Sequence, residues 1–213
     1  HLSIRRQRQM CIRDRIGSVF AAAGYAHIVV DPRGQGWGHP TLTENCPDAH
    51  DGTGAPGFMT QSLSDPHGHY YRRLFTDAFR CFQAAREMEL VDPTRIAVLG
   101  HSQGGGQAIA VCALAAMRGI KLAGAFVDVP FLCHIRRSCD IATDGPYLEV
   151  VRYLAAHPLL CGRAFQTLGY FDSLHFAPSG PNFYLVFSRD DGPSGTTVVS
   201  VGGIQRLGRR HGC

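Results

Sequence analysis

Residues 95–106, which read Arg-Ile-Ala-Val-Leu-Gly-His-Ser-Gln-Gly-Gly-Gly, decide the fold of this chain. The apolar run at 96–99 is typical of a parallel strand that is covered on both faces. The alanine-rich stretch from Gln107 to Arg118 predicts a helix. Ser102 therefore lies on a Gly-x-Ser-x-Gly turn between a strand and a helix, an arrangement known as a nucleophile elbow.

The same turn offers the groups that acyl transfer through a serine requires. Because the turn is sharp and crowded, we expect small residues on both sides of the serine, and Gly100 and Gly104 stand there. The backbone N–H of Gln103 opens the following helix, whose positive end stabilises an oxyanion. We therefore predict Ser102 as the nucleophile and Gln103 as an oxyanion donor. The alternative is a chance match in a chain with 25 glycines, but the strand before the turn and the helix after it favour the elbow.

Composition places the chain among globular proteins with one domain. Its 213 residues are 45% hydrophobic, which is enough for a sizeable core. The net charge of +4 comes from residues 1–15, which hold five arginines and one aspartate, so the other 198 residues balance at 16 basic and 16 acidic side chains. We therefore expect no nucleic-acid groove. No apolar run approaches 18 residues, so we expect no membrane span and a cytoplasmic protein.

The two ends of the chain differ from the part between them. Residues 1–15 lack the apolar core of a signal peptide and resemble translated sequencing-adapter DNA, so we expect them to be non-native. We expect a partial α/β domain over residues 16–203 and a tail that does not match it over residues 204–213. The eight cysteines form no Cys-x-x-Cys pair, and Cys81 and Cys112 fall in apolar helical stretches, which favours reduced core thiols.

Helical and strand patterns alternate along the chain, as in α/β proteins. The region from 131 to 180 is less regular, which suggests an insertion or lid, and residues 37–69 read as a long irregular excursion near the site. The expected elements are a helix at 16–23 capped by Gly24, a strand at 26–30, an amphipathic helix at 70–90, a strand at 122–129, a helix at 147–156 and a strand at 183–187.

Several motifs together resemble the cephalosporin-C deacetylase and acetyl xylan esterase family, carbohydrate esterase family 7. The resemblance covers about residues 19–200. It rests on Arg33-Gly34-Gln35, Gly57-Phe58-Met59-Thr60, Tyr70-Tyr71-Arg72-Arg73, the elbow at 100–105, Val129-Pro130-Phe131-Leu132-Cys133 and Pro146-Tyr147-Leu148-Glu149-Val150.

The family resemblance implies both a fold and an activity. The fold is that of the α/β-hydrolases, with a mostly parallel, doubly wound sheet, here incomplete. The activity is that of a serine esterase that removes acetyl groups from small xylo-oligosaccharides or cephalosporin-C-like compounds. It implies a small acetylated substrate and a homo-hexamer, and we expect no cofactor.

The resemblance also implies roles for residues outside the elbow. It places Asp190 on the catalytic aspartate, with Asp191 as a one-residue alternative, although Arg189 replaces an apolar residue of the family pattern and Ser194-Gly195 replace two prolines. For Arg33, Gly34 and Gln35, we favour a structural role in which the arginine anchors its loop through backbone carbonyls.

The general base of the mechanism is not found in this sequence. In the family it is a histidine of a His-Glu pair near the C-terminus, and no His-Glu pair occurs here. His211 lies in the non-matching tail and is not assigned, and we expect His101 to point away from Ser102. The family's second oxyanion donor would precede residue 19. We therefore expect this chain alone to be a nearly inactive fragment of an esterase.

Other interpretations remain open at this stage. His67 and His69 form a His-x-His pair, but no further ligands follow at convincing spacing, so we expect no zinc. The chain could instead belong to another α/β-hydrolase, dienelactone-hydrolase-like or peptidase-like, or be a noncatalytic α/β domain. A His-Glu pair in the complete protein would favour the deacetylase.

Overall fold

The computed structural model describes residues 20, 22–30, 32–34 and 57–176, together with the backbone of 183–186. The predictions for residues 1–15 and 204–213, for Gln35 and for Asp190 and Asp191 fall outside these residues. The chain divides into two compact units. One comprises His1–Pro56 and Arg80–Pro93, and the other comprises Gly57–Phe79 and Thr94–Cys213. The second unit contains the sheet and the turn around Ser102.

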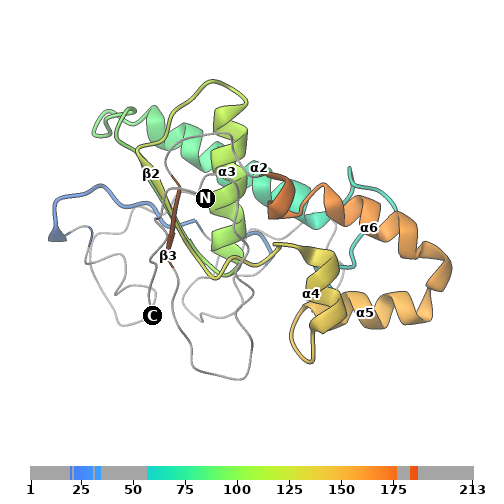
Figure 1. Cartoon of the computed structure of the whole chain (residues 1–213). Coiled ribbons are helices and arrows are strands. Elements are labelled where there is room, and N and C mark those ends of the chain that lie inside the picture. Colours follow the sequence, from blue (N-terminus) through green and yellow to red (C-terminus); the bar gives the residue numbers. More distant parts are fainter. Residues whose placement is uncertain (1–19, 21, 31, 35–56, 177–182, 187–213) are drawn as a thin grey trace, which may run out of the picture. The chain divides into compact units, whose positions relative to one another are not determined.

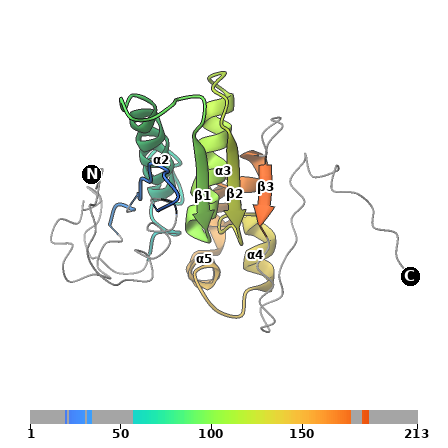
Figure 2. The ribbon, with the colours of Figure 1, turned by 90° about the vertical axis from the view of Figure 1, so that its left-hand side faces the viewer.

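In the described part of the second unit, three parallel strands form a sheet, in the order in which they occur along the chain. They are β1 (Ala97–His101), β2 (Gly124–Asp128) and β3 (Phe183–Val186). The parallel sheet confirms the α/β prediction, and Figure 2 shows the three strands side by side and pointing the same way. The register pairs His101 with Asp128, so both residues lie at the carboxyl edge of the sheet.

Helix α3 (Gln103–Ala116) begins directly after Ser102, four residues before the predicted start. The first turn was not predicted because it contains three glycines, at 104–106, and glycine is a poor helix former. Its buried Ile109 and Cys112 pack on the sheet face that carries Ala125 and Val127.

The opposite face of the sheet is less covered than predicted. The side chain of Leu99 is 52% exposed and that of its register partner Phe126 is 40% exposed. The expectation of a strand covered on both faces is therefore wrong for the residues that the structure describes. Helix α3 covers the face to which Val98 and Val127 belong. Because side chains alternate between the two faces of a strand, Leu99 and Phe126 point to the opposite face, which α3 does not cover.

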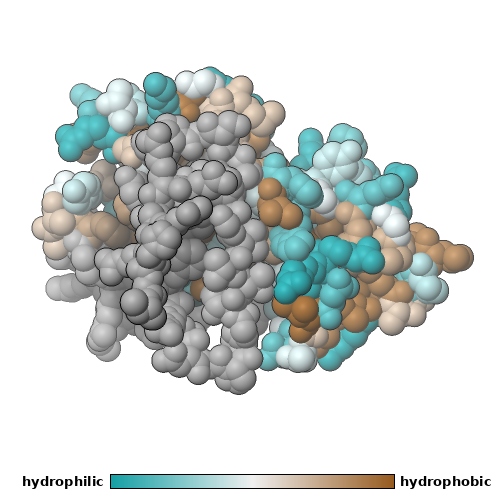
Figure 3. Space-filling model, viewed as in Figure 1, coloured by the Kyte–Doolittle hydropathy of each residue, from teal (hydrophilic) through white to brown (hydrophobic). Residues whose placement is uncertain are grey.

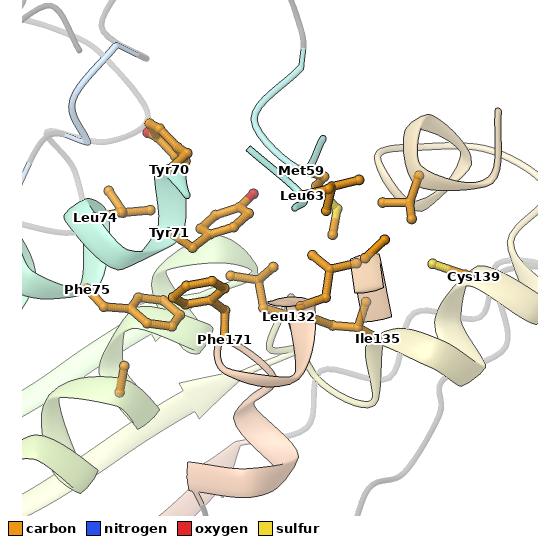
Figure 4. Packing of buried hydrophobic residues seen from close by; sticks show 14 residues of the cluster. Met59, Leu63, Tyr70, Tyr71, Leu74, Phe75, Leu132, Ile135, Cys139 and Phe171 are labelled. Carbon is orange, nitrogen blue, oxygen red and sulfur yellow. The ribbon is translucent and has the colours of Figure 1, made fainter. Parts of the chain in front are cut away.

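A second core lies beside the sheet and is built largely from aromatic residues. The first turns of α2 (Tyr70–Arg86) contribute Tyr70, Tyr71 and Phe75 to it. Figure 4 shows Leu132 and Ile135 pointing into the same cluster from the chain that follows β2. The full set of buried residues is Met59, Leu63, Tyr70, Tyr71, Leu74, Phe75, Ala110, Leu132, Ile135, Cys139, Val150, Ala164, Leu168 and Phe171.

The chain between β2 and β3 is more helical than its sequence indicates (Figure 1). The predicted helix at 147–156 is confirmed with the same bounds, while the flanking helices were not predicted because one is short and the other contains two glycines. Its elements are α4 (Ile135–Ile141), α5 (Tyr147–Ala156), η2 (Pro158–Leu160), α6 (Cys161–Gly169) and η3 (Ser173–Phe176). Hydrophobic and hydrophilic patches mix on the visible surface of this helical region (Figure 3), and Leu159 is 97% exposed.

The first unit is described in shorter pieces. Gly24 adopts φ +85°, and the N–H of Tyr25 donates to the carbonyl of Phe20 at 3.0 Å, which confirms Gly24 as a helix C-cap. Val29 forms an isolated bridge where a strand at 26–30 was predicted. In the described part of the chain, no helix is both long and apolar enough to cross a membrane.

Of the two cysteines predicted as core thiols, Cys112 is buried and Cys81 is only partly buried. Cys112, Cys133 and Cys139 are free and buried. Burial raises the pKa of the Cys112 thiol to about 12, so that thiol is protonated and unreactive at neutral pH.

Candidate active site

Ser102 occupies a strained turn between β1 and α3. Its backbone has φ +52° and ψ −116°, a conformation that costs an L-residue on the order of 1–3 kcal/mol. The residue is exposed, and its side chain does not cap α3. The hydroxyl is thus presented to solvent at the carboxyl end of β1, the edge at which ligands bind in parallel α/β sheets.

The crowding that enforces this turn is concentrated at Gly100. A Cβ atom added to Gly100 would overlap the backbone carbonyl of Gly104, so only glycine fits. A Cβ atom added to Gly104 would meet no heavy atom within 4 Å. The prediction that both flanking glycines are sterically required is therefore correct for Gly100 and wrong for Gly104, whose backbone, not its missing side chain, makes the close approach.

Backbone hydrogen bonds attach the turn to the end of the neighbouring strand β2. The N–H of Ser102 donates to the carbonyl of Asp128 at 3.0 Å, and the N–H of Phe131 donates to the carbonyl of Ser102 at 2.9 Å. A Cβ atom on Gly106 would lie 2.5 Å from the carbonyl oxygen of Phe131. The position of Ser102 thus depends on the chain that leaves β2.

That chain, residues 129–134, is here called the β2–α4 segment. Val129, Leu132 and His134 all have positive φ, at +35°, +62° and +51°, although none is glycine. Each such residue stores roughly 1–3 kcal/mol of strain, which persists only where surrounding contacts impose it. One of these contacts is the hydroxyl of Tyr147, which accepts a hydrogen bond from the N–H of Leu132 at 3.0 Å. Burial raises the pKa of Tyr147 to about 12, so its hydroxyl keeps its proton.

His101 is held by a carboxylate at the same edge of the sheet. Its Nδ1 lies 2.8 Å from Oδ2 of Asp128, with side-chain exposures of 69% and 24%. Such exposed pairs contribute about 0–1 kcal/mol. This contact occupies Nδ1 of His101 with its cross-strand neighbour, and the expectation that His101 points away from Ser102 stays a prediction.

The predicted site residues fall in both units, and each unit is described by itself. Ser102 and Gln103 are adjacent on the turn. Arg33 and Gly34 belong to the first unit, where Arg33 is partly buried and Gly34 has φ +68°. Gln35 and Asp190 lie outside the described residues, so their roles stay predictions.

The His-x-His pair does not form a common site. His67 is exposed, whereas His69 is fully buried and stacks on Phe171 with ring centroids 4.7 Å apart. The N–H of Tyr71 donates to its Nδ1 at 3.2 Å, and its Nε2 lies 3.3 Å from the carbonyl of Met59. These bonds describe a neutral ring protonated on Nε2, and burial lowers the pKa of His69 to about 4. Within the described residues, no group of three His, Cys, Asp or Glu side chains could hold a metal ion.

Sequence reasoning missed the residues that brace the turn, namely Asp128, Phe131 and Tyr147. A signal for the first two was available, because they follow a predicted strand at the edge where Ser102 was expected. The contribution of Tyr147 comes from a separate helix and has no local signal.

Known proteins resemble this chain over most of its length. The family model for acetyl xylan esterase matches residues 7–183. The solved structure of an acetyl xylan esterase from Paenibacillus sp. R4 is 32% identical, with a TM-score of 0.69, and the match covers 80% of this chain and 52% of that chain.

A second solved structure shares the fold at lower identity. Acetyl xylan esterase 1 from Thermoanaerobacterium sp. JW/SL YS485 is 24% identical, with a TM-score of 0.68, and the match covers 80% of this chain and 53% of that chain. The chain thus spans about half the length of both solved relatives. Together with the parallel sheet and the turn at Ser102, the family match shows that the chain has the α/β-hydrolase fold and belongs to the acetyl xylan esterase family.

Proposed function

We propose that this chain carries the nucleophile of a serine esterase that removes acetyl groups from small acetylated sugars. The observation that carries the proposal is the strained, exposed Ser102 at the carboxyl end of β1, on a turn that only glycine at position 100 permits. Such a turn holds a serine oxygen clear of the sheet, where an ester carbonyl can approach. Membership of the acetyl xylan esterase family supports acetyl esters as the substrate class.

In the proposed reaction, Oγ of Ser102 attacks the acetyl carbonyl carbon while a base takes its proton. The tetrahedral oxyanion accepts a hydrogen bond from the N–H of Gln103, at the positive end of α3. The C–O bond to the sugar then breaks, the base returns the proton to the departing sugar oxygen, and acetyl remains on Ser102. Water attacks this acyl-enzyme and releases acetate.

The remaining two members of the triad are assigned by resemblance. Asp190, or Asp191 in its place, would orient a histidine that acts as the base. That histidine would come from a part of the protein corresponding to the half of the relatives that this chain does not span. Acetylated xylo-oligosaccharides are the proposed substrates, with cephalosporin-C-like acetyl esters as a second class.

The test uses a completed chimera, in which the Paenibacillus esterase supplies every segment outside residues 57–186 of this chain. The chimera is expected to release acetate from acetylated xylo-oligosaccharides, and its Ser102→Ala variant to lose at least about 10⁴-fold in kcat. The 213-residue chain is expected to show no measurable turnover.

Ser64→Ala, a change at another serine of the same unit, serves as the matched control. A folded chimera whose Ser102→Ala variant keeps its activity would refute the proposal. If the chimera fails to fold, residues 97–135 are instead grafted into the Paenibacillus esterase, and the dependence of activity on Ser102 is measured there.

A further inference from the structure

A buried carboxylate on the far side of the β2–α4 segment has no part in the proposed chemistry. Asp172 follows α6 and is 5% exposed. Its Oδ1 accepts hydrogen bonds from the N–H groups of His134 at 2.7 Å and Leu174 at 3.0 Å, and its Oδ2 accepts one from the N–H of Ile135 at 2.7 Å. Three backbone donors thus converge on one buried side chain.

The donors at positions 134 and 135 lie where the strained segment enters α4. His134 is the N-cap residue of α4 in the left-handed region, and its side chain makes no capping bond. The cap is supplied instead by Asp172, 38 residues away in the chain. The next peptide reinforces the contact, because the N–H of Ser173 donates to the carbonyl of Leu132 at 2.7 Å.

The segment held in this way reaches Ser102 directly. From Leu132 the chain runs back to Phe131, whose N–H donates to the carbonyl of Ser102, and to Asp128, whose carbonyl accepts from the N–H of Ser102. Positive φ values at Val129, Leu132 and His134 mean that the segment would relax without an anchor at its far end. We propose that Asp172 is a positioning residue for the nucleophile turn, acting on Ser102 through the β2–α4 segment.

The proposal rests on the proposed function only for its catalytic consequence. Asp172→Asn preserves size but replaces one acceptor oxygen with an N–H₂ group, which would face a backbone donor. Two controls match it. Asp140→Asn makes the same chemical change at an exposed position on α4, and Ser173→Ala removes a buried hydroxyl for which the described residues show no hydrogen-bond partner.

Amide hydrogen exchange on the 213-residue chain tests the coupling. In Asp172→Asn, the amides of Phe131 and Ser102 are expected to exchange at least 10-fold faster. The amide of Ala123, which donates to the carbonyl of Ile96 at the other end of the β1–β2 pair, should keep its rate, as should all three amides in both controls.

Two results would overturn the proposal. Faster exchange confined to His134 and Ile135 would make Asp172 a helix cap and nothing more. An equal acceleration at Ala123 would indicate a general loss of stability. If Asp172→Asn does not fold, Tyr147→Phe loosens the same segment from another element, and the same amides are expected to respond by a smaller factor.

In the completed chimera, Asp172→Asn is expected to lower kcat at least 10-fold with KM changed less than 2-fold. An unchanged kcat beside accelerated exchange at Phe131 would refute the catalytic consequence. A chimera that is inactive without any substitution would instead count against the proposed function, and the exchange data would still decide the role of Asp172.

Discussion

The turn around Ser102 and the helical region from α4 to α6 are held by different kinds of contact. The turn depends on neighbours close in sequence, such as Gly100 against Gly104, and on backbone bonds to the end of β2. The helical region is tied down by side chains that bond to backbone far away in the chain. Glu149 binds Thr60 across 89 residues, and Arg163 donates to the carbonyl of Ser64 across 99. A sequence motif can indicate steric crowding between neighbouring residues, but it does not indicate hydrogen bonds between residues far apart in the chain.

The largest effect is expected from Gly100→Ala, which breaks the local crowding itself. The added Cβ would overlap the carbonyl of Gly104, so the turn must open, at a cost of more than about 3 kcal/mol in the free energy of unfolding. Urea denaturation followed by circular dichroism measures it. A loss below about 1 kcal/mol would show that the turn is not as tight as the structure indicates.

The second largest effect is expected from His69, which stacks on Phe171 in the aromatic core, and it concerns the pH dependence of stability. The pKa of His69 is about 4 when folded and near 6.5 when unfolded, so the unfolded chain binds the proton more readily. The contribution of this ring to the free energy of unfolding is therefore fully present above pH 6.5. It decreases as the pH falls from 6.5 toward 4, by up to about 3 kcal/mol.

Unfolding free energies measured in urea between pH 7 and pH 4 check this. His69→Gln should flatten the pH dependence, while the exposed His67→Gln should leave it in place. Equal slopes in all three proteins would mean that His69 titrates normally in the folded state.

A smaller effect is expected for the tether between α5 and the chain before α2. Oε1 of Glu149 accepts hydrogen bonds from the N–H of Thr60 at 2.9 Å and from its hydroxyl at 2.6 Å. Glu149→Ala should cost about 1–2 kcal/mol. In a double-mutant cycle with Thr60→Val, a coupling of about 0.5–1 kcal/mol is expected, and additive losses would show that the hydroxyl contact contributes nothing.

The contrast between contacts close in sequence and contacts distant in sequence also explains which parts of the fold and the site can be predicted from the sequence. The elbow, the parallel strands and α5 were predicted because hydrophobic pattern and glycine spacing are local. Helix α4 was not predicted because it is only 7 residues long and because its N-cap is a carboxylate that Asp172 supplies from beyond α6. For the site, Ser102 and its turn were predictable, whereas the brace from Tyr147 was not, because its partner peptide at Leu132 adopts a left-handed conformation that its residue type does not suggest.

The smallest effect is expected from Gly104→Ala, which sharpens the comparison with Gly100. A Cβ atom has open space at this position, and alanine favours the helical conformation that α3 needs there. The free energy of unfolding should be unchanged or raised by up to about 1 kcal/mol. A loss comparable to that of Gly100→Ala would show that both glycines are required, as the motif alone had indicated.

The most direct test of the account is covalent labelling of Ser102. The completed chimera is treated with a fluorophosphonate, and mass spectrometry of its peptides locates the adduct. The account predicts stoichiometric modification of the Ser102 oxygen, with none in Ser102→Ala. An active chimera that carries the adduct on another residue, or none at all, would contradict it.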